Sequence, residues 1–456
     1  MNTPFLLSSR LSFFRSRRRL KSFFFRRMSL QTEAEGILET HVTWEEVEKR
    51  LQESLKTNAK FGKNKSVVHV GEGNGFLSRI GLITCDWEGA KDDEKLPKQF
   101  ALKMASCMAA KKMEERTPEA MKLDLDAMKQ MWDYMEMFVK DTHNAEVKAY
   151  EFLRKFEDSV AVPHCYYTVP FSDENKLAGS IALDYLDNTR ISHVYQTLSV
   201  AQVKQVAQEL GKMQALSILN GVEKEEWLSQ RDVYTAFWRN FTPEVFTQMF
   251  GPIKEVDASI SECVDAVIEL IPMYFGSNFA ITLHKQYGVR PVLVNGDLWS
   301  ANVLVDKETE QIRALIDWQL VHQGTGVEDL LRIAYSGMKT EDRRAHMDEF
   351  LDVMYDSMEE TLQGAPAPYT REQMRELYEL VLPHAGFFVA PIPLFLATMA
   401  DPDLTEEEKE QRKEIVLDKV RGLCEDIVIF HKKNESKKKY EWKALDFVPN
   451  AAQKTE

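Results

Sequence analysis

The chain has 456 residues, of which 44% are hydrophobic and 29% charged, and its formal net charge at pH 7 is -14. This length and composition are typical of a globular protein with two or more lobes and exclude wholesale disorder. The acidic balance excludes a general nucleic-acid binder, because a phosphate backbone requires a basic face. The five cysteines include no C-x-x-C pair, which is typical of a reducing compartment and favours a cytoplasmic protein.

Residues 1–40 form an extension of unusual composition. Its first 30 residues contain eight Lys and Arg, and the first carboxylate is Glu33. Such an Arg- and Ser-rich start resembles a mitochondrial presequence, and a disordered extension is an equal alternative. Arginines interrupt every apolar run, which argues against a secretory signal. The most apolar later stretch, Ala385–Ala400, is too short and too rich in proline to predict a membrane span.

Hydrophobic periodicity predicts a strand-rich part followed by a helical part. The expected elements are a helix at 41–56, strands at 66–87 and 98–106, helices at 109–139 and 144–156, and a strand at 180–188. From residue 199 onward the pattern is mainly helical. We therefore expect an α+β protein with an N-lobe at 41–186, a C-lobe at 187–438 and a charged tail at 439–456.

A glycine-rich segment, "VGEGNGFLSR" at residues 70–79, joins two expected strands. Gly71, Gly73 and Gly75 let the backbone turn tightly and present N–H groups to phosphates, although an ordinary hairpin turn has the same pattern. A Rossmann site is excluded because a strand, and not a helix, follows. Next in the chain, Lys103 lies in the apolar strand "FALKMA", where a lysine usually points to solvent.

The most informative stretch is "VLVNGDLWSANVLVD" at residues 292–306. Asp297 and Asn302 lie between two apolar strands, and the next apolar run ends at Asp317. If the last two strands pair as a hairpin through "KETEQ", Asn302 and Asp317 come to the same end, where an amide oxygen and a carboxylate suit Mg²⁺. Asp297 can then orient or deprotonate a hydroxyl, which is the layout of phosphoryl transfer. Two strands with polar ends are the alternative interpretation.

The string "NGDLWSANVLVD…IDWQ" resembles the catalytic and metal loops of the CHK kinase-like (ecdysteroid-kinase-like) proteins, in their nematode-like branch. These proteins are related to choline/ethanolamine kinases and aminoglycoside phosphotransferases. The resemblance implies a two-lobed protein-kinase-like fold with a small antiparallel-sheet N-lobe and a mainly helical C-lobe. It implies that Asp297 is the catalytic base, that Asn302 and Asp317 bind Mg²⁺, and that Asp329 braces the catalytic loop; for Asp329 a simple helix-start acid is the alternative. One departure is Asn295, where the family often has His.

The same resemblance predicts which residues bind the nucleotide. Lys103 would contact the ATP phosphates and would be held by an acid on the following helix, with Glu146 as the candidate and Glu151 as its competitor. Asp184 and Leu186 would belong to an interlobe hinge that presents backbone groups to adenine, and a plain strand end is the alternative.

The predicted function is that of a kinase transferring the γ-phosphate of ATP to the hydroxyl of a small-molecule alcohol, with Mg²⁺. Choline, ethanolamine, a sterol or another metabolite each fit as the acceptor, and the oligomeric state is open. A catalytically silent, nucleotide-binding pseudokinase is the alternative. A protein kinase is disfavoured, because the chain lacks an A-P-E segment and has "IDWQ" in place of D-F-G.

Overall fold

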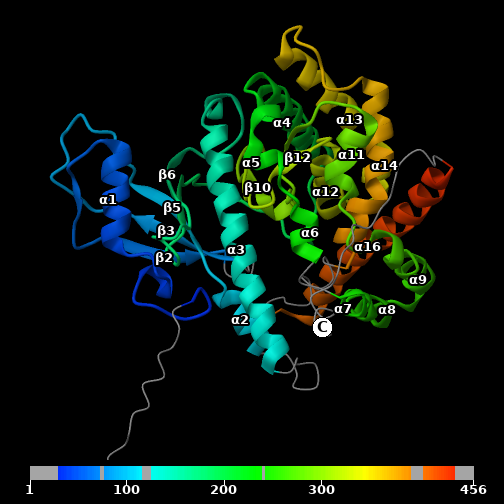
Figure 1. Cartoon of the computed structure of the whole chain (residues 1–456), viewed down its shortest axis with the longest axis horizontal. Coiled ribbons are helices and arrows are strands. Elements are labelled where there is room, and N and C mark those ends of the chain that lie inside the picture. The colour runs from blue at the N-terminus through cyan, green and yellow to red at the C-terminus, as the bar shows by residue number, and fades with distance from the viewer. Residues whose placement is uncertain (1–28, 72–76, 116–124, 239–241, 392–403, 437–456) are drawn as a thin grey trace, which may run out of the picture.

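The computed structural model describes residues 29–71, 77–115, 125–238, 242–391 and 404–436. They form a strand-rich lobe and a helical lobe, and the long helix α3 (Leu125–Leu153) runs beside the sheet (Figure 1). The predicted α+β class, with a small antiparallel sheet followed by a mainly helical part, is confirmed. The chain passes from one lobe to the other after residue 184, and the exact domain bounds stay a prediction.

A five-stranded antiparallel sheet, in the order β2-β3-β5-β7-β6, forms the first lobe. Alternating burial along β3 places Ile83 in the core with Leu102 of β5, as the period of two requires. Val47 and Leu51 of α1 belong to the same core, so one helix face covers this side of the sheet. The elements of this lobe besides α3 are α1 (Trp44–Leu55), β1 (Lys60–Phe61), β2 (Ser66–Val70), β3 (Ser78–Thr84), β4 (Trp87–Glu88), β5 (Gln99–Ala105), α2 (Met108–Glu115), β6 (Cys165–Val169) and β7 (Ser180–Asp184).

Helix α3 corrects the prediction of two helices at 109–139 and 144–156. It runs unbroken through the polar residues between them, which carry neither glycine nor proline. The hydroxyl of Thr142 donates to the carbonyl of Phe138 at 2.8 Å, so this polar side chain is satisfied within the helix. The hydrophobic periodicity changes there while the backbone continues, and this is why the pattern was misleading.

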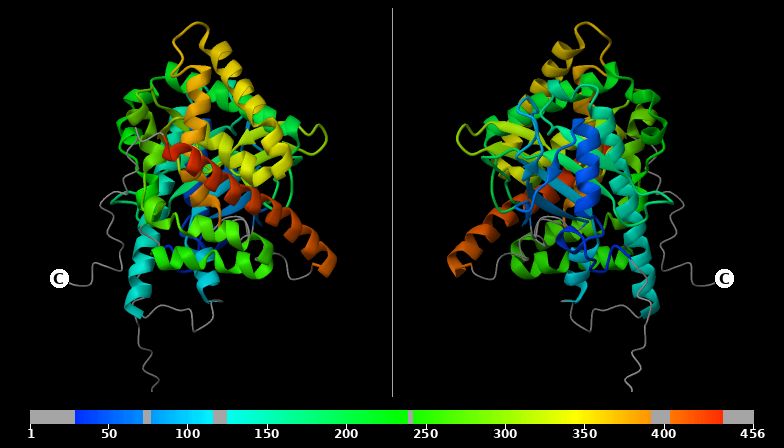
Figure 2. Two further views of the ribbon diagram at one scale, coloured as in Figure 1. Left: turned by 90° about the vertical axis from the view of Figure 1, so that its right-hand side faces the viewer. Right: turned by 90° about the vertical axis from the view of Figure 1, so that its left-hand side faces the viewer.

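In the second lobe, α13 packs along α4 and α14 packs against α16, which crosses the lobe obliquely (Figure 2). No helix among the described residues is both long and apolar enough to cross a membrane. The elements are β8 (Thr189–Arg190), α4 (Val200–Leu219), α5 (Glu226–Ser229), α6 (Val233–Trp238), α7 (Pro243–Gln248), α8 (Gly251–Val256), α9 (Ser261–Ile268), α10 (Ile271–Tyr274), α11 (Phe279–Tyr287), β9 (Val292–Val294), β10 (Val303–Asp306), β11 (Ile312–Leu315), β12 (His322–Gly324), α12 (Val327–Gly337), α13 (Thr340–Leu362), α14 (Arg371–Val389) and α16 (Glu406–Glu435).

Two antiparallel pairs of short strands bring the polar loops together. The predicted hairpin is present, since β10 pairs with β11 and Val303 lies opposite Leu315. Strand β9, which precedes one loop, pairs with β12, which follows the other. The loops at 295–302 and 316–321 therefore lie at the same end of these strands.

Candidate active site

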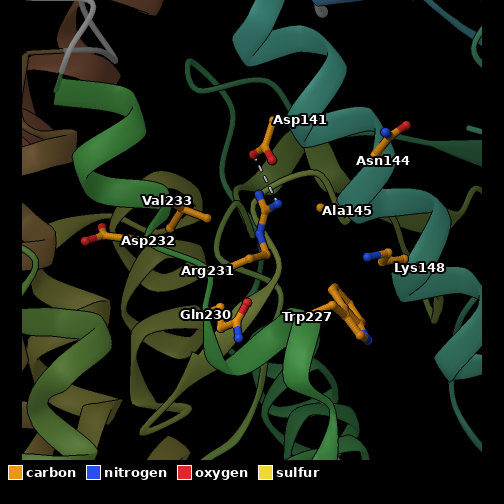
Figure 3. A pocket seen from close by; sticks show the side chains of 9 residues that line it. All are labelled: Asp141, Asn144, Ala145, Lys148, Trp227, Gln230, Arg231, Asp232 and Val233. Atoms are coloured by element: carbon orange, nitrogen blue, oxygen red, sulfur yellow. Dashed lines mark hydrogen bonds and ion pairs between the residues drawn. The ribbon is translucent and has the colours of Figure 1, made fainter. Parts of the chain in front are cut away.

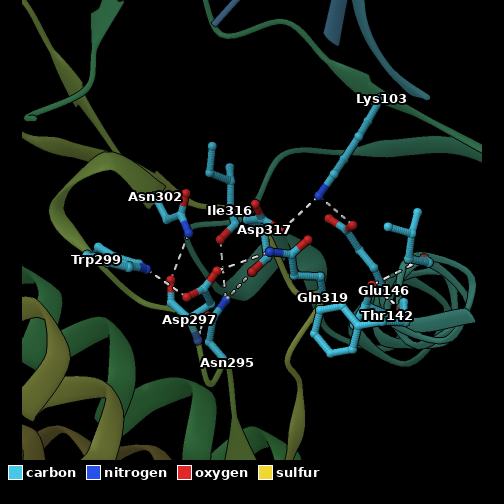
Figure 4. Close-up of polar contacts among 12 residues, drawn as sticks. Lys103, Thr142, Glu146, Asn295, Asp297, Trp299, Asn302, Ile316, Asp317 and Gln319 are labelled. Carbon is cyan, nitrogen blue, oxygen red and sulfur yellow. Dashed lines mark hydrogen bonds and ion pairs between the residues drawn. The ribbon is translucent and has the colours of Figure 1, made fainter. Parts of the chain in front are cut away.

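Lys103 links the two lobes through two carboxylates. Its Nζ lies 2.6 Å from Oε2 of Glu146 on α3 and 2.8 Å from Oδ1 of Asp317 (Figure 4). Lys103 is only 9% exposed and Glu146 only 1%, whereas Glu151 is exposed. The lysine therefore points into the site and not to solvent, and Glu146 rather than Glu151 is the acid that it contacts.

The charges in this group depend on one another. Burial acts to lower the pKa of Lys103, but the carboxylates of Asp317 and Glu146 outweigh it and raise the pKa above its usual value. Burial raises the pKa of Glu146 to about 7, against the effect of the Lys103 ammonium. Lys103 thus stays protonated, and its charge is what favours an ionised Glu146 at this depth.

Asp297 lies beside this group in the loop after β9, held by three donors. Nε1 of Trp299 donates to its Oδ1 at 2.7 Å, and Nε2 of Gln319 donates to its Oδ2 at 3.2 Å. Nδ2 of Asn302 donates to the main-chain carbonyl of Asp297 at 2.7 Å. Burial, with a contribution from the Asp317 carboxylate, raises the pKa of Asp297 to about 7. A carboxyl with a pKa near neutrality and a fixed orientation suits proton acceptance from a hydroxyl.

Asn302 and Asp317 meet at the same end of the β10–β11 hairpin. The main-chain carbonyl of Asn302 accepts the N–H of Ile316 at 3.0 Å, which ties the two loops together directly before Asp317. The amide nitrogen of Asn302 is directed to the main-chain carbonyl of Asp297. The side chain of Asp317 is 26% exposed and therefore accessible.

Asn295 connects both loops. Its Oδ1 accepts the N–H of Asp297 at 3.0 Å, and its Nδ2 lies 3.3 Å from the carbonyl oxygen of Asp317. The backbone of Asp317 has a φ of +61°, a left-handed conformation that Asp tolerates better than most residues. One amide thus holds both the loop that carries Asp297 and the turn that presents Asp317.

Asp329, at the start of α12, lies beneath the loop that carries Asp297. It is 1% exposed, and its carboxylate accepts the N–H of Asn295 at 2.7 Å and that of Gly296 at 2.9 Å. Gly296 has a φ of +80°, and a Cβ atom there would lie 2.3 Å from the carbonyl oxygen of Leu320. Only glycine fits this turn, and Asp329 satisfies its amide.

We expect Asp329→Ala to destabilise the protein by about 2–4 kcal/mol, because two buried N–H groups lose their acceptor. Urea unfolding of the wild type and the variant measures this loss. Asp342→Ala is the matched control, since Asp342 is an exposed acid in the first turn of α13. Equal losses in both variants, each of about 0.5 kcal/mol, would mean that Asp329 is only a helix-start acid.

The predicted nucleotide-contacting residues lie at the sheet. The glycine-rich segment joins the antiparallel strands β2 and β3, and Gly71 has a φ of +70°. Gly73 and Gly75 fall outside the described residues. At the end of β7, the N–H of Asp184 donates to a neighbouring carbonyl, and the carbonyl of Leu186 accepts a hydroxyl. The contacts of all five with a nucleotide stay predictions.

Two residues of the site were missed by the sequence reasoning, Trp299 and Gln319. Both stand within the quoted motif, two residues after Asp297 and two after Asp317, respectively. Reading the motif as D-x-x-x-x-N treats them as spacers, although an indole N–H and an amide are obvious donors for a nearby buried carboxylate. That donor chemistry was the signal that could have found them.

The profile of the family DUF1679, described as "Uncharacterized oxidoreductase dhs-27", matches residues 30–435 of this chain. The chain belongs to this family. A curated relative, "Uncharacterized kinase-like protein D1044.1" of Caenorhabditis elegans, is 24% identical over 283 residues, covering 58% of this chain and 70% of the relative. The predicted relationship to kinase-like proteins is confirmed.

A second curated relative gives the DUF1679 family its description. "Uncharacterized oxidoreductase dhs-27" of Caenorhabditis elegans is 22% identical over 302 residues, which cover 62% of this chain but only 34% of that protein. The chain therefore spans about a third of that relative's length. Every strand pair among the described residues is antiparallel, so this part of the chain contains no parallel dinucleotide-binding sheet.

Solved structures similar to this DUF1679 member include two phosphotransferases. Choline kinase from Cryptosporidium parvum Iowa II is 12% identical, with a TM-score of 0.42, and the match covers 82% of this chain and 91% of that one. Spectinomycin phosphotransferase, solved with ADP and spectinomycin, is 12% identical, with a TM-score of 0.39, and the match covers 85% and 99%.

Proposed function

We propose that this protein transfers the γ-phosphate of ATP to the hydroxyl of a small-molecule alcohol, giving a phosphate monoester and ADP. The observation that carries the proposal is Lys103 Nζ between Glu146 and Asp317, with the half-buried carboxylate of Asp297 beside it. A fixed ammonium next to an accessible carboxylate suits the phosphates and the metal of a nucleotide, and a separate carboxylate suits the acceptor.

The residues present fit Mg²⁺. Within the described ranges, no three His, Cys, Asp or Glu side chains cluster as a complete metal cage. Mg²⁺ typically uses one or two protein groups and completes its shell with water and phosphate oxygens. Asp317 and the amide oxygen of Asn302 would hold it, and when bound it would offset the charge of the phosphates.

Each side chain has a separate task in this scheme. Lys103 binds the phosphates and Glu146 positions Lys103, as their 2.6 Å contact supports. Asp297 accepts a hydrogen bond from the acceptor hydroxyl, orients its oxygen for in-line attack on the γ-phosphorus and takes its proton as the P–O bond to ADP breaks. Trp299 and Gln319 keep the Asp297 carboxylate in one orientation.

The test is ADP release from Mg-ATP in a panel of alcohols that includes choline, ethanolamine, sterols and amino sugars, with mass spectrometry of the products. We expect one class of alcohol to raise ADP release above the rate with water and to appear as its phosphate monoester. Tight binding of Mg-ATP without any phosphorylated product, in the panel or in metabolite extracts, would instead support the pseudokinase alternative.

A further inference from the structure

A cavity lies outside the group around Lys103. It has a volume of about 410 Å³ and is formed by one face of α3 and by the segment from α5 to the start of α6 (Figure 3). This volume is within the range of small-molecule pockets. Asp141 and Lys148 line it from α3, and Trp227, Arg231 and Asp232 line it from the opposite side.

The acids of this cavity are already engaged. Asp232 accepts hydrogen bonds from the backbone and hydroxyl of Thr235 at 2.8 Å each and from the amide of Asn278 at 2.9 Å. Asp141 pairs with Arg231 at 3.2 Å, and its side chain is 62% exposed. An entering anion can therefore replace Asp141 at the guanidinium at little cost, because the released carboxylate is already hydrated.

The two cationic side chains of this cavity, Arg231 and Lys148, are only partly engaged by protein groups. Of the five N–H donors of Arg231, one bonds Asp141 and one bonds the carbonyl of Gln319 at 3.2 Å. Its Nε–H has no acceptor among the described residues, although the side chain is only 10% exposed. Burial lowers the pKa of Arg231 below its usual value, against the opposing effect of Asp141. Lys148 is exposed and has no ion-pair partner in the described part of the chain.

An aromatic surface completes the cavity. The Nζ of Lys148 lies 5.7 Å from the centroid of the Trp227 ring, so this face already carries a cation. Nε1 of Trp227 is held by Glu225 at 2.9 Å, which fixes the orientation of the indole. A ligand cation would be repelled by Lys148 and Arg231, whereas a flat body with an acid group meets the ring and both charges.

We propose that this cavity binds a small organic anion, a carboxylate or phosphate ester on a flat apolar body, with its acid group on Arg231 and Lys148 and its body against Trp227. The site does not depend on the proposed kinase function. It is nevertheless joined to Asp297, because Gln319 accepts from Arg231 through its carbonyl and donates to Asp297 through its side chain.

Calorimetric titration of the full chain with phenyl phosphate tests the proposal, with benzyltrimethylammonium as a cation of similar size. We expect saturable binding of phenyl phosphate that persists in excess Mg-ADP, and much weaker binding of the cation. Lys148→Met and Arg231→Met should each weaken phenyl phosphate about tenfold, the effect of losing one charge-assisted contact. Lys129→Met, which removes an exposed lysine elsewhere on α3, should leave it unchanged.

Four results would overturn the proposal: no binding of phenyl phosphate, its displacement by Mg-ADP, equal binding of the cation, or wild-type affinity in Lys148→Met. Arg231 also contacts the main chain of Gln319, so its variant can fail to fold. In that case Trp227→Leu replaces it. Loss of phenyl phosphate binding with unchanged Mg-ADP binding is the result expected for Trp227→Leu, and unchanged binding of both ligands contradicts the proposed site.

Discussion

Asp297→Asn should abolish most phosphoryl transfer and leave nucleotide binding intact. The amide is the same size and can still accept from Trp299, but it cannot take up the acceptor's proton. We expect kcat to fall about 10²–10⁴-fold, the usual contribution of a positioned general base. Mg-ADP affinity should stay unchanged, because Asp297 is not among the carboxylates that contact Lys103. Initial rates of ADP release and titration calorimetry measure the two quantities.

Glu308→Gln is the matched control for Asp297→Asn. Glu308 is an exposed acid in the turn of the β10–β11 hairpin, at the end away from Asn302 and Asp317. Its conversion to an amide changes the net charge by the same amount without touching the site. Transfer at the wild-type rate in Asp297→Asn would show that another group accepts the proton. An equal loss of rate in both variants would point to a general charge effect.

The parts of the site that could be predicted are those held together by local chain geometry. Asn302 and Asp317 are 15 positions apart, at the two ends of a predicted hairpin. When the two apolar strands pair, both residues come to the open end of that hairpin. The buried lysine on β5 could be placed only through the family resemblance, because an apolar strand alone does not say which face a lysine occupies. The single helix α3 was missed since its polar middle section breaks the hydrophobic period without breaking the backbone.

Contacts between distant segments could not be predicted. Arg231 and Gln319 are separated by 88 positions, and their hydrogen bond depends on how α5 and α6 pack against α3 and the loop after β11. Neither residue lies in a sequence pattern that predicts this hydrogen bond. The cavity at Trp227 likewise exists only after these helices have packed. Side chains that support a site from outside its motif are set by tertiary packing, which periodicity does not encode.

Lys103→Met should weaken nucleotide binding and also make folding stability strongly dependent on pH. Loss of its charge-assisted contacts with phosphate should lower Mg-ADP affinity about 10–100-fold. The variant also leaves Glu146, which is 1% exposed, without its cation. Breaking one side of a buried ion pair costs about 3–5 kcal/mol, so we expect a loss of this order at pH 8. Lys98→Met, an exposed lysine just before β5, is the control and should change neither quantity.

The pH dependence separates the two effects of Lys103→Met. Burial already raises the pKa of Glu146 to about 7 with the lysine present, and without the ammonium the folded-state pKa rises further above its unfolded value. The folded variant therefore binds a proton that the unfolded chain releases, and its stability increases as the pH falls from 8 to 5.5. Adding Glu146→Gln should remove this pH dependence and restore part of the stability at pH 8, because position 146 then carries no buried charge. Nucleotide affinity should stay low. Urea unfolding of Lys103→Met and of the double variant at pH 5.5 and pH 8 measures this dependence. If Lys103→Met loses the same stability at both pH values, Glu146 does not depend on Lys103 for its charge.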